Sequence, residues 1–293
     1  MILYTSFYKK EFIRLKENNL RHDTTGRIKY FFLISHGIPF LMTGSLMALE
    51  GSIFVSNSFF NQIIYVAFLS PIVAAIIIIY RYYSNNEKSD YFLSIIDFRR
   101  IPLKVFLFIL LFPVFIRWLA SVMAGQFVIS VIQFDFSPQM SLSYAIMLLF
   151  FGPIPEELGW RGVALPALNA RYGFQKAVLF LGFMWAIWHL PLFFFRETFQ
   201  YQLGLFTPLF WSFMAGVFFT SIILGAIFNE TKQSIFAVIL FHYLDNLTGE
   251  AFLVSANAEI LSNIIRAIIA MMIFVHYGRK YMSNGTIVSV KKF

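Results

Sequence analysis

Long apolar runs alternate with short polar connections along almost the whole chain. About eight of these runs are long and apolar enough for membrane spans, although Pro or Gly interrupts several of them. They cover about 31–49, 60–81, 103–126, 142–165, 176–195, 206–228, 234–248 and 260–278. The chain shows no internal repeat and no low-complexity tract. The pattern therefore predicts an all-α fold, a single polytopic transmembrane helical bundle.

Lys and Arg are unevenly distributed among the connections. Basic residues gather in 1–30, 81–104, 171–176, 229–233 and 279–292, whereas the connections near 50–60, 127–141 and 249–259 have none. The 196–205 connection, with Arg196 beside Glu197, is the departure from a full alternation. Basic loops stay on the cytoplasmic side of a membrane. We therefore expect both termini in the cytoplasm.

The two ends of the chain lie outside the predicted bundle, which covers 31–280. In residues 1–30, Tyr8, Phe12 and Leu15 share one helical face among basic residues. That pattern is typical of a helix lying on the membrane surface, and a frayed cytoplasmic tail is the equal alternative. Residues 281–293 are expected to form a cytoplasmic tail.

Composition supports a membrane location. Hydrophobic residues make up 59% of the chain and charged residues only 13%, against about 25% charged in soluble domains. The chain contains no Cys, which excludes disulfides, thiolate metal sites and a cysteine nucleophile. The net charge of +8 comes from the ends of spans, so it does not indicate nucleic acid. We expect a multi-pass protein of the cell membrane with lipid around it.

One stretch places charges inside the fourth apolar run. Gly152–Gly162 contains Glu156, Glu157 and Arg161 between apolar flanks. Each ionisable group at bilayer depth costs roughly 2.5–3.5 kcal/mol on insertion scales, so the cluster predicts a functional site. Glu157 and Arg161 are four residues apart, the spacing of a helical ion pair, whereas Glu156 lies about 100° round the helix and has no local partner. The alternative is a pair that only clamps two helices.

Two further stretches carry polar side chains at a similar depth. His189 lies four residues after Trp185 and just before Pro191, and His242 lies four residues before Asn246. Glu156, His189 and His242 lie about 9–13 residues from the cytoplasmic ends of their spans, or roughly 13–20 Å at 1.5 Å per residue. We therefore expect these side chains from three spans to meet in one cavity.

Such a set suits the activation of water. A carboxylate removed from bulk water binds a proton more readily, and an imidazole beside it can share the same water. His242 and Asn246 can donate hydrogen bonds to a developing oxyanion. Glu156, His189 and His242 are also a workable zinc set, although the His-Glu-x-x-His and Gly-x-Ser-x-Gly signatures are absent. The pattern does not choose between a metal-free glutamate mechanism and a zinc site, so no cofactor is assigned and zinc stays the alternative.

Three motifs together resemble a known family. Glu156-Glu157-x-x-x-Arg161, Trp185-x-x-x-His189 and His242-x-x-x-Asn246 are similar in order and spacing to the motifs of the CPBP intramembrane proteases. This is the CAAX protease and bacteriocin-processing family, also called the Abi family. The resemblance covers about 142–250, the protease core of the bundle. One position departs from the family, since Trp185 stands where Phe is usual.

The resemblance implies a role for each motif residue. Glu156 and His189 would activate the water, while His242 and Asn246 would form the oxyanion hole. Glu157, Arg161 and Trp185 would support and orient them. The implied activity is that of an intramembrane endopeptidase acting on a peptide or membrane protein, in bacteriocin or pheromone maturation or in self-immunity.

Three other interpretations compete with this one. The protein could be a non-catalytic immunity or adaptor protein of the same family, or a CAAX prenyl endopeptidase. It could also be a transporter that uses buried charges as a relay, but the chain lacks paired broken helices in matching halves. Arg117 in the third span has no predicted role: it could pair with a site carboxylate, snorkel or bind lipid head groups.

Overall fold

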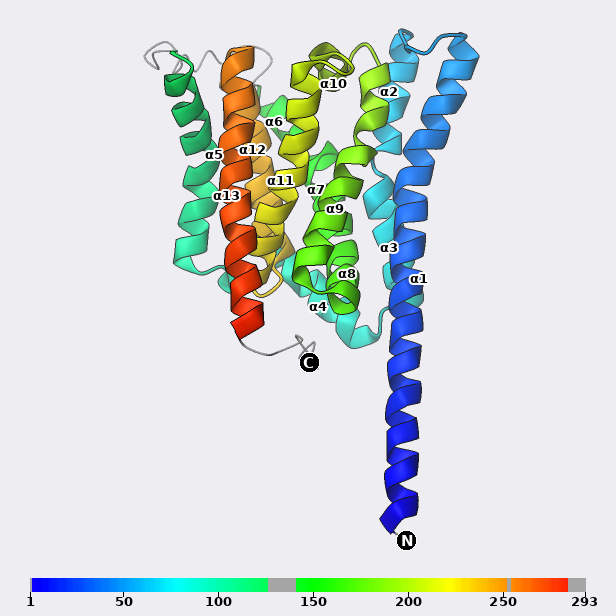
Figure 1. Cartoon of the computed structure of the whole chain (residues 1–293). Helices are drawn as coiled ribbons and strands as arrows, with labels where there is room; N and C mark the ends of the chain where they lie inside the picture. The colour runs from blue at the N-terminus through cyan, green and yellow to red at the C-terminus, as the bar shows by residue number, and fades with distance from the viewer. Residues whose placement is uncertain (1, 126–140, 252–253, 284–293) are drawn as a thin grey trace.

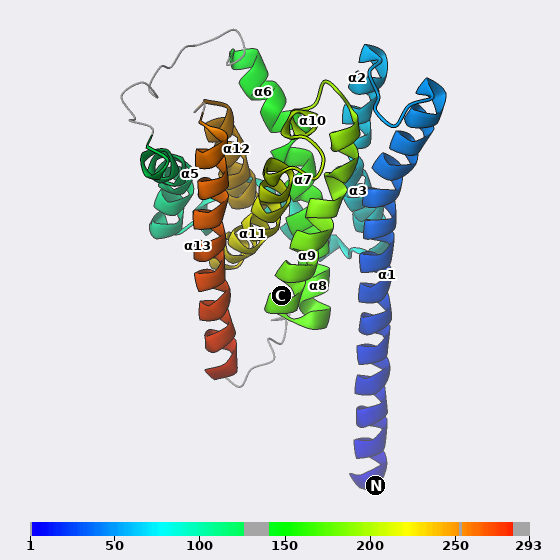
Figure 2. The ribbon, with the colours of Figure 1, turned by 45° about the horizontal axis from the view of Figure 1, so that its top comes forward.

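The computed structural model describes residues 2–125, 141–251 and 254–283, with side chains described from residue 24 to residue 279. Helices and their connections make up this described part, which contains no strand, apart from one isolated bridge between Val55 and Phe195. The helices pack side by side into one bundle (Figures 1 and 2). Their bounds are α1 Ile2–Glu50, α2 Ser58–Ala67, α3 Ser70–Tyr82, α4 Asn85–Ile96, η1 Phe98–Arg100, α5 Leu103–Met123, α6 Leu142–Phe151, α7 Pro153–Gly159, η4 Trp160–Ala164, α8 Leu165–Tyr172, α9 Phe174–Trp188, η5 Leu190–Phe194, α10 Phe199–Leu203, α11 Pro208–Glu230, α12 Ile235–Ala251 and α13 Ala256–Ser283.

Six helical stretches of the described residues are long and apolar enough to cross a membrane, so the predicted multi-pass helical bundle is confirmed. They are Thr24–Glu50, Ser58–Tyr82, Leu103–Met123, Phe174–Phe194, Pro208–Glu230 and Ala256–Arg279. Each matches one of the runs predicted from the sequence.

The other two predicted spans have a different form. The run 142–165 is broken into α6, α7 and the π-helix η4, because Gly152 ends α6 and Pro153 begins α7. Pro is favoured at the first position of a helix, where its missing N–H is not needed. The run 234–248 lies in α12, which has 17 residues and is short for a full span. The broken segment 153–164 and helix α12 both carry candidate site residues.

The ends of the bundle agree in part with the predicted layout. Helix α1 runs without a break from Ile2 to Glu50, so the predicted surface segment and first span form one helix. The side chains of Tyr8, Phe12 and Leu15, the connection 126–140 and the tail from residue 284 lie outside what the structure describes. Helix α1 begins and α13 ends on the same side of the bundle, where α4 also lies (Figure 1). That this side is cytoplasmic stays a prediction.

Helix α7 lies at the centre of the bundle in close contact with α3 and α12. A Cβ atom on Gly159 would lie 2.6 Å from the backbone oxygen of Pro71, so only glycine permits this approach of α7 to α3. The next residue, Trp160, is fully buried, and its ring lies 5.1 Å from that of Phe31 and 5.7 Å from that of Trp188. The glutamates of α7 are thereby held inside a rigid aromatic core.

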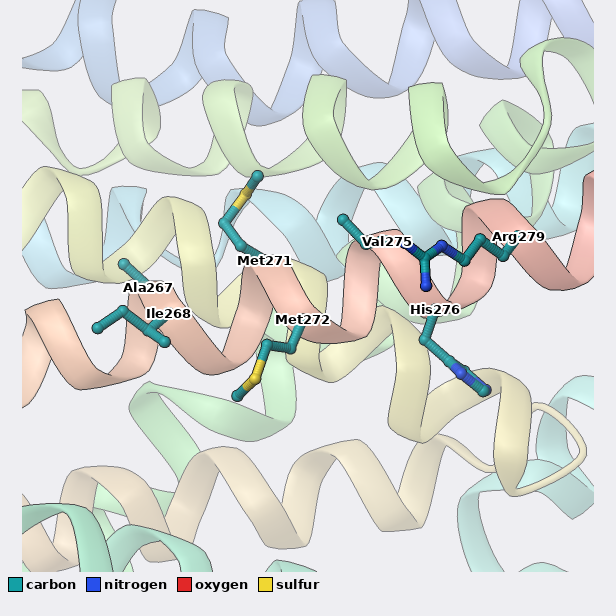
Figure 3. Close-up of a pocket in the computed structure, with 7 residues that line it drawn as sticks. All are labelled: Ala267, Ile268, Met271, Met272, Val275, His276 and Arg279. Atoms are coloured by element: carbon teal, nitrogen blue, oxygen red, sulfur yellow. The ribbon is translucent and has the colours of Figure 1, made fainter.

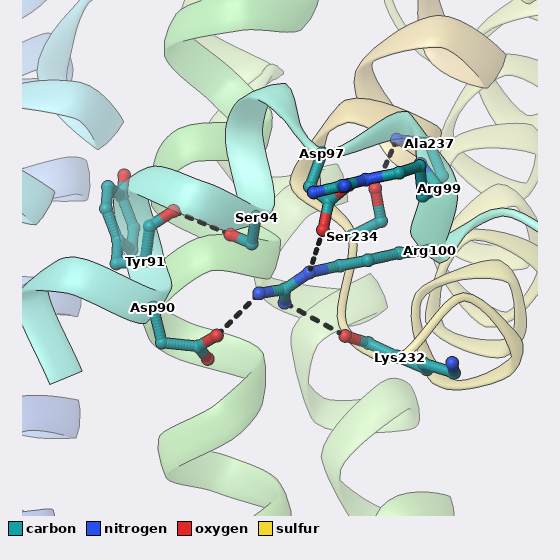
Figure 4. A network of polar contacts seen from close by, with 9 residues as sticks. All are labelled: Asp90, Tyr91, Ser94, Asp97, Arg99, Arg100, Lys232, Ser234 and Ala237. Atoms are coloured by element: carbon teal, nitrogen blue, oxygen red, sulfur yellow. Dashed lines mark hydrogen bonds and ion pairs between the residues drawn. The ribbon is translucent and has the colours of Figure 1, made fainter. Parts of the chain in front are cut away.

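A polar cluster fixes the start of α12 (Figure 4). The Arg100 guanidinium lies 2.6 Å from Asp90 and donates to the carbonyl of Lys232 at 3.2 Å. Lys232 adopts a left-handed backbone conformation with φ of 51°, and Ser234 Oγ accepts from the N–H of Ala237 in the first turn of α12. The segment α4–η1 therefore anchors the turn from which α12 rises.

Candidate active site

Glu156 and Glu157 are adjacent in α7 and both are buried, with 7% and 0% of their surface exposed. The indole Nε1–H of Trp185 donates to Oε2 of Glu156 at 2.6 Å. Glu156 therefore has a partner from α9, which its local sequence does not reveal. The N–H of Trp185 is a donor that a phenylalanine at this position would lack.

Glu157 joins two other helical segments. Its Oε1 accepts from Arg161 Nη1 at 2.8 Å and from His242 Nδ1 at 2.8 Å. A carboxylate beside a guanidinium is an acceptor, so Nδ1 of His242 carries the proton. Nε2 is then the nitrogen left for chemistry. Glu157 thus sets both the tautomer and the direction of the His242 ring.

Arg161 lies in the π-helix η4 and is fully buried. Its guanidinium carbon lies 4.3 Å from the centroid of the Trp185 ring, a cation–π contact. Within the described residues, Nε and Nη2 of Arg161 and Oε2 of Glu157 have no hydrogen-bond partner. Buried polar atoms of this kind are usually satisfied by ordered water. The ion pair therefore keeps two nitrogen donors and one oxygen acceptor that its own contacts do not use.

His189 caps the C-terminal end of α9. Its backbone N–H donates to the carbonyl of Ala186, three residues back, and not to the carbonyl of Trp185, four residues back. The Trp185 carbonyl is therefore left without its helical donor. That carbonyl accepts from His189 Nδ1 at 2.8 Å. A carbonyl only accepts, so Nδ1–H is the donor and Nε2 of the neutral ring is an acceptor. The ring also packs edge-on against Phe213 of α11 at 5.4 Å.

Trp185 is the common neighbour of the two histidines. Its ring centroid lies 5.8 Å from that of His189 and 5.3 Å from that of His242. Asn246, half-buried, lies one turn beyond His242 and beside the junction of α6 and α7, where a Cβ on Gly152 would lie 3.7 Å from its amide nitrogen. The structure thus gathers Glu156, Glu157, Arg161, Trp185, His189 and His242, with Asn246 at the edge.

Metal-ligating side chains are not clustered in the part of the chain that the structure describes. No group of three or more His, Cys, Asp or Glu side chains among them is placed to hold a metal ion together. The Trp185 N–H also occupies one oxygen of Glu156. The structure therefore does not bring Glu156, His189 and His242 together as such a group; zinc at these residues stays the alternative, and no step below uses a metal.

A surface groove lies away from these residues. It follows the surface of α13 and has a volume of about 660 Å³. Figure 3 shows its lining, in which Met271 and Met272 lie along the helix and His276 and Arg279 lie towards its end. It shares no residue with the site around Glu156.

Two charged pairs were not foreseen from the sequence. Arg117 Nη1 lies 2.5 Å from Glu259 Oε2, so α5 pairs with α13 and Arg117 does not reach a site carboxylate. Arg266 Nη2 lies 2.7 Å from Asp245 Oδ1, joining α13 to α12. The signal for the second pair is an arginine within an apolar run, which always needs a partner.

Comparisons with known proteins point to one family. Residues 138–248 match a family model described as Rce1-like, type II CAAX prenyl endopeptidase. The chain is 26% identical over 265 residues to the CAAX prenyl protease 2 of Methanococcus maripaludis, covering 87% of this chain and 96% of that protein.

The matched interval contains all three motifs, and the resemblance to the CAAX-type protease family is confirmed. The class of protein that the fold and the comparisons support is an intramembrane endopeptidase.

Proposed function

We propose that the protein hydrolyses peptide bonds within the membrane by a water molecule that Glu156 activates. The observation that carries this proposal is the buried Glu156 carboxylate, held through Oε2 by Trp185 at 2.6 Å. Its Oε1 makes no hydrogen bond to the described residues and is the atom that would accept a proton from water. A positioned carboxylate is a common general base.

His189 supports the same water. Its Nδ1–H is held by the Trp185 carbonyl, so Nε2 presents a lone pair to a second water proton. The attacking oxygen forms a bond to the carbonyl carbon of the substrate while its proton passes to Glu156. When the C–N bond breaks, that proton is returned to the leaving amine.

His242 and Asn246 are the proposed oxyanion donors. His242 Nδ1–H is held by Glu157, so Nε2 donates to the oxyanion when the ring is an imidazolium, and Glu157 balances that charge. The Asn246 amide, one turn along the same helix, is the second donor. Donors fixed in advance at the place where negative charge develops are an effective form of transition-state stabilisation.

The substrate is proposed to be a peptide that reaches the site from the membrane. The matched family and the relative from M. maripaludis carry names that describe CAAX prenyl endopeptidases, which favours a peptide ending in a prenylated Cys-a-a-X sequence. A role in bacteriocin or pheromone maturation, or in self-immunity, stays a prediction from the motif resemblance.

The test uses two fluorogenic peptides of the same Cys-a-a-X sequence, one farnesylated and one not. The purified protein in lipid vesicles is expected to cleave the farnesylated peptide, and mass spectrometry locates the broken bond. Cleavage of both peptides alike would assign a broader peptide substrate. Cleavage of neither, together with identical membrane and secreted peptides in a deletion strain and its parent, would favour the non-catalytic adaptor.

A further inference from the structure

The rotation of α12 about its axis decides where two proposed oxyanion donors point. His242 and Asn246 lie one turn apart on the same face of this helix. Side-chain ends lie about 5–6 Å from a helix axis, so a rotation of about 20° moves them by about 2 Å. A misplacement of about 1 Å can lower a catalytic rate about 100-fold. The site therefore needs something that stops α12 from turning.

Asp245 is placed to provide this stop. It lies about 60° from His242 and about 100° from Asn246 round the helix. Its Oδ1 accepts from Arg266 Nη2 of α13 at 2.7 Å, and the two side chains are only 14% and 15% exposed. The pair pulls α12 towards α13, to one side of the direction in which His242 contacts Glu157. Helix α12 also packs against α5, α7 and α11, and the ion pair adds to this packing a directional contact at a second angle round the helix.

Arg266 is itself held in place. Its Nη1 donates to Asn263 Oδ1 at 3.1 Å, and the Asn263 amide donates to Ser212 Oγ of α11 at 2.9 Å. A Cβ on Gly216 would lie 2.4 Å from Asn263 Oδ1, so the glycine makes room for this amide. The chain of hydrogen bonds from Asp245 thus ends on α11.

Helix α11 also contacts His189. Phe213, the residue after Ser212, packs its ring 5.4 Å from that of His189. The network from Asp245 to Ser212 therefore links the helix of the oxyanion donors to the helix that supports the water-binding histidine.

We propose that Asp245 and Arg266 are a positioning pair that sets the rotation of α12 and thereby aims His242 and Asn246 at the reacting carbonyl. The inference rests on the proposed function. Apolar side chains of similar size would often stabilise the fold as well as a buried ion pair does. Unlike apolar packing, the ion pair fixes which side of α12 faces α13.

The experiment removes both charges together, so that neither is left buried alone. The double variant Asp245→Leu/Arg266→Met is compared with wild type on the farnesylated reporter, in kcat, KM and thermal midpoint. We expect kcat to fall about 10–100-fold with little change in KM or midpoint. The single variant Asp245→Asn loses the opposite charge, but its amide oxygen can still accept from Arg266, so its kcat should stay close to that of the wild type even if its midpoint falls.

The matched control is Arg117→Met/Glu259→Leu. Its side chains are 16% and 29% exposed, and its ion pair joins α13 to α5. The Arg117 guanidinium packs beside Gly249 of α12 but makes no ion pair with that helix. We expect the control to keep kcat. Wild-type kcat in the Asp245/Arg266 variant with a lowered midpoint would overturn the inference, and so would an equal loss of kcat in the control.

Failure of the inference differs from failure of the proposed function. If the wild-type protein cleaves neither reporter, the proposed function falls and the positioning role falls with it. If Glu156→Gln abolishes cleavage but Asp245→Leu/Arg266→Met does not slow it, the positioning role alone is wrong.

Discussion

The indole N–H of Trp185 donates to the Glu156 carboxylate at 2.6 Å. The same indole lies under the Arg161 guanidinium and against the rings of both site histidines. One side chain of α9 therefore contacts the proposed base and its neighbours. Where the related proteases usually carry phenylalanine, this chain has a residue that can also orient the carboxylate.

Replacing Trp185 with Phe tests this orientation. The variant Trp185→Phe keeps an aromatic ring but loses the donor, so Glu156 is free to turn. We expect kcat on the peptide reporter to fall about 10–100-fold, the range that a misplaced catalytic group produces. Trp160→Phe is the control, because the Trp160 N–H has no hydrogen-bond partner among the described residues. A similar loss in both variants would mean that ring size, not the hydrogen bond, matters.

Removing the Arg161 charge should destabilise the fold. Arg161→Met leaves Glu157 buried and without its strongest partner. Breaking a buried ion pair by removing one partner costs about 3–5 kcal/mol, which should appear as a lower thermal midpoint in detergent. The exposed Arg99 pairs with Asp97 at the surface, and Arg99→Met should leave the midpoint unchanged. An unchanged midpoint for Arg161→Met would show that the pair is not needed for folding.

The close approach of α7 to α3 gives a test of how the glutamates are held. Gly159→Ala places a methyl group 2.6 Å from the Pro71 carbonyl oxygen, and backbone must move to accept it. Overpacking of this kind typically costs 1–3 kcal/mol, and we expect turnover to fall because α7 shifts. Gly37→Ala, where nothing lies within 4 Å of the new methyl group, should keep both stability and turnover. Normal turnover in Gly159→Ala would mean that α7 tolerates displacement.

Treatment with a metal chelator tests the choice of mechanism. Because Glu156, His189 and His242 are not arranged as a metal-binding group, prolonged incubation with a strong chelator should leave reporter cleavage at its original rate. Loss of cleavage that added zinc restores would assign the reaction to a metal site instead.

The sequence predicts the bundle and the local pairs well, because both depend on residues close together in the chain. Six of the eight apolar runs match helical stretches of the described residues that are long and apolar enough to cross a membrane, and four-residue spacing gives the Glu157–Arg161 pair. The same spacing places Trp185 beside His189. These features follow from helix periodicity alone.

Contacts between distant helices cannot be predicted in this way. The Trp185–Glu156 bond, the Glu157–His242 bond and the partner of Arg117 depend on how helices are placed relative to one another. The breaks at Gly152 and in the π-helix Trp160–Ala164 alter that placement. A pattern of hydropathy shows that such charges need partners but does not say which.

The most direct test of the proposed function is turnover by Glu156→Gln. Glutamine keeps the shape and can still accept from Trp185, but it cannot take a proton from water. The account predicts that kcat on the reporter falls by about 10²–10⁴, the contribution of a general base, while Glu250→Gln, an exposed acid outside the site, is as active as wild type. Wild-type turnover by a folded Glu156→Gln protein would contradict it.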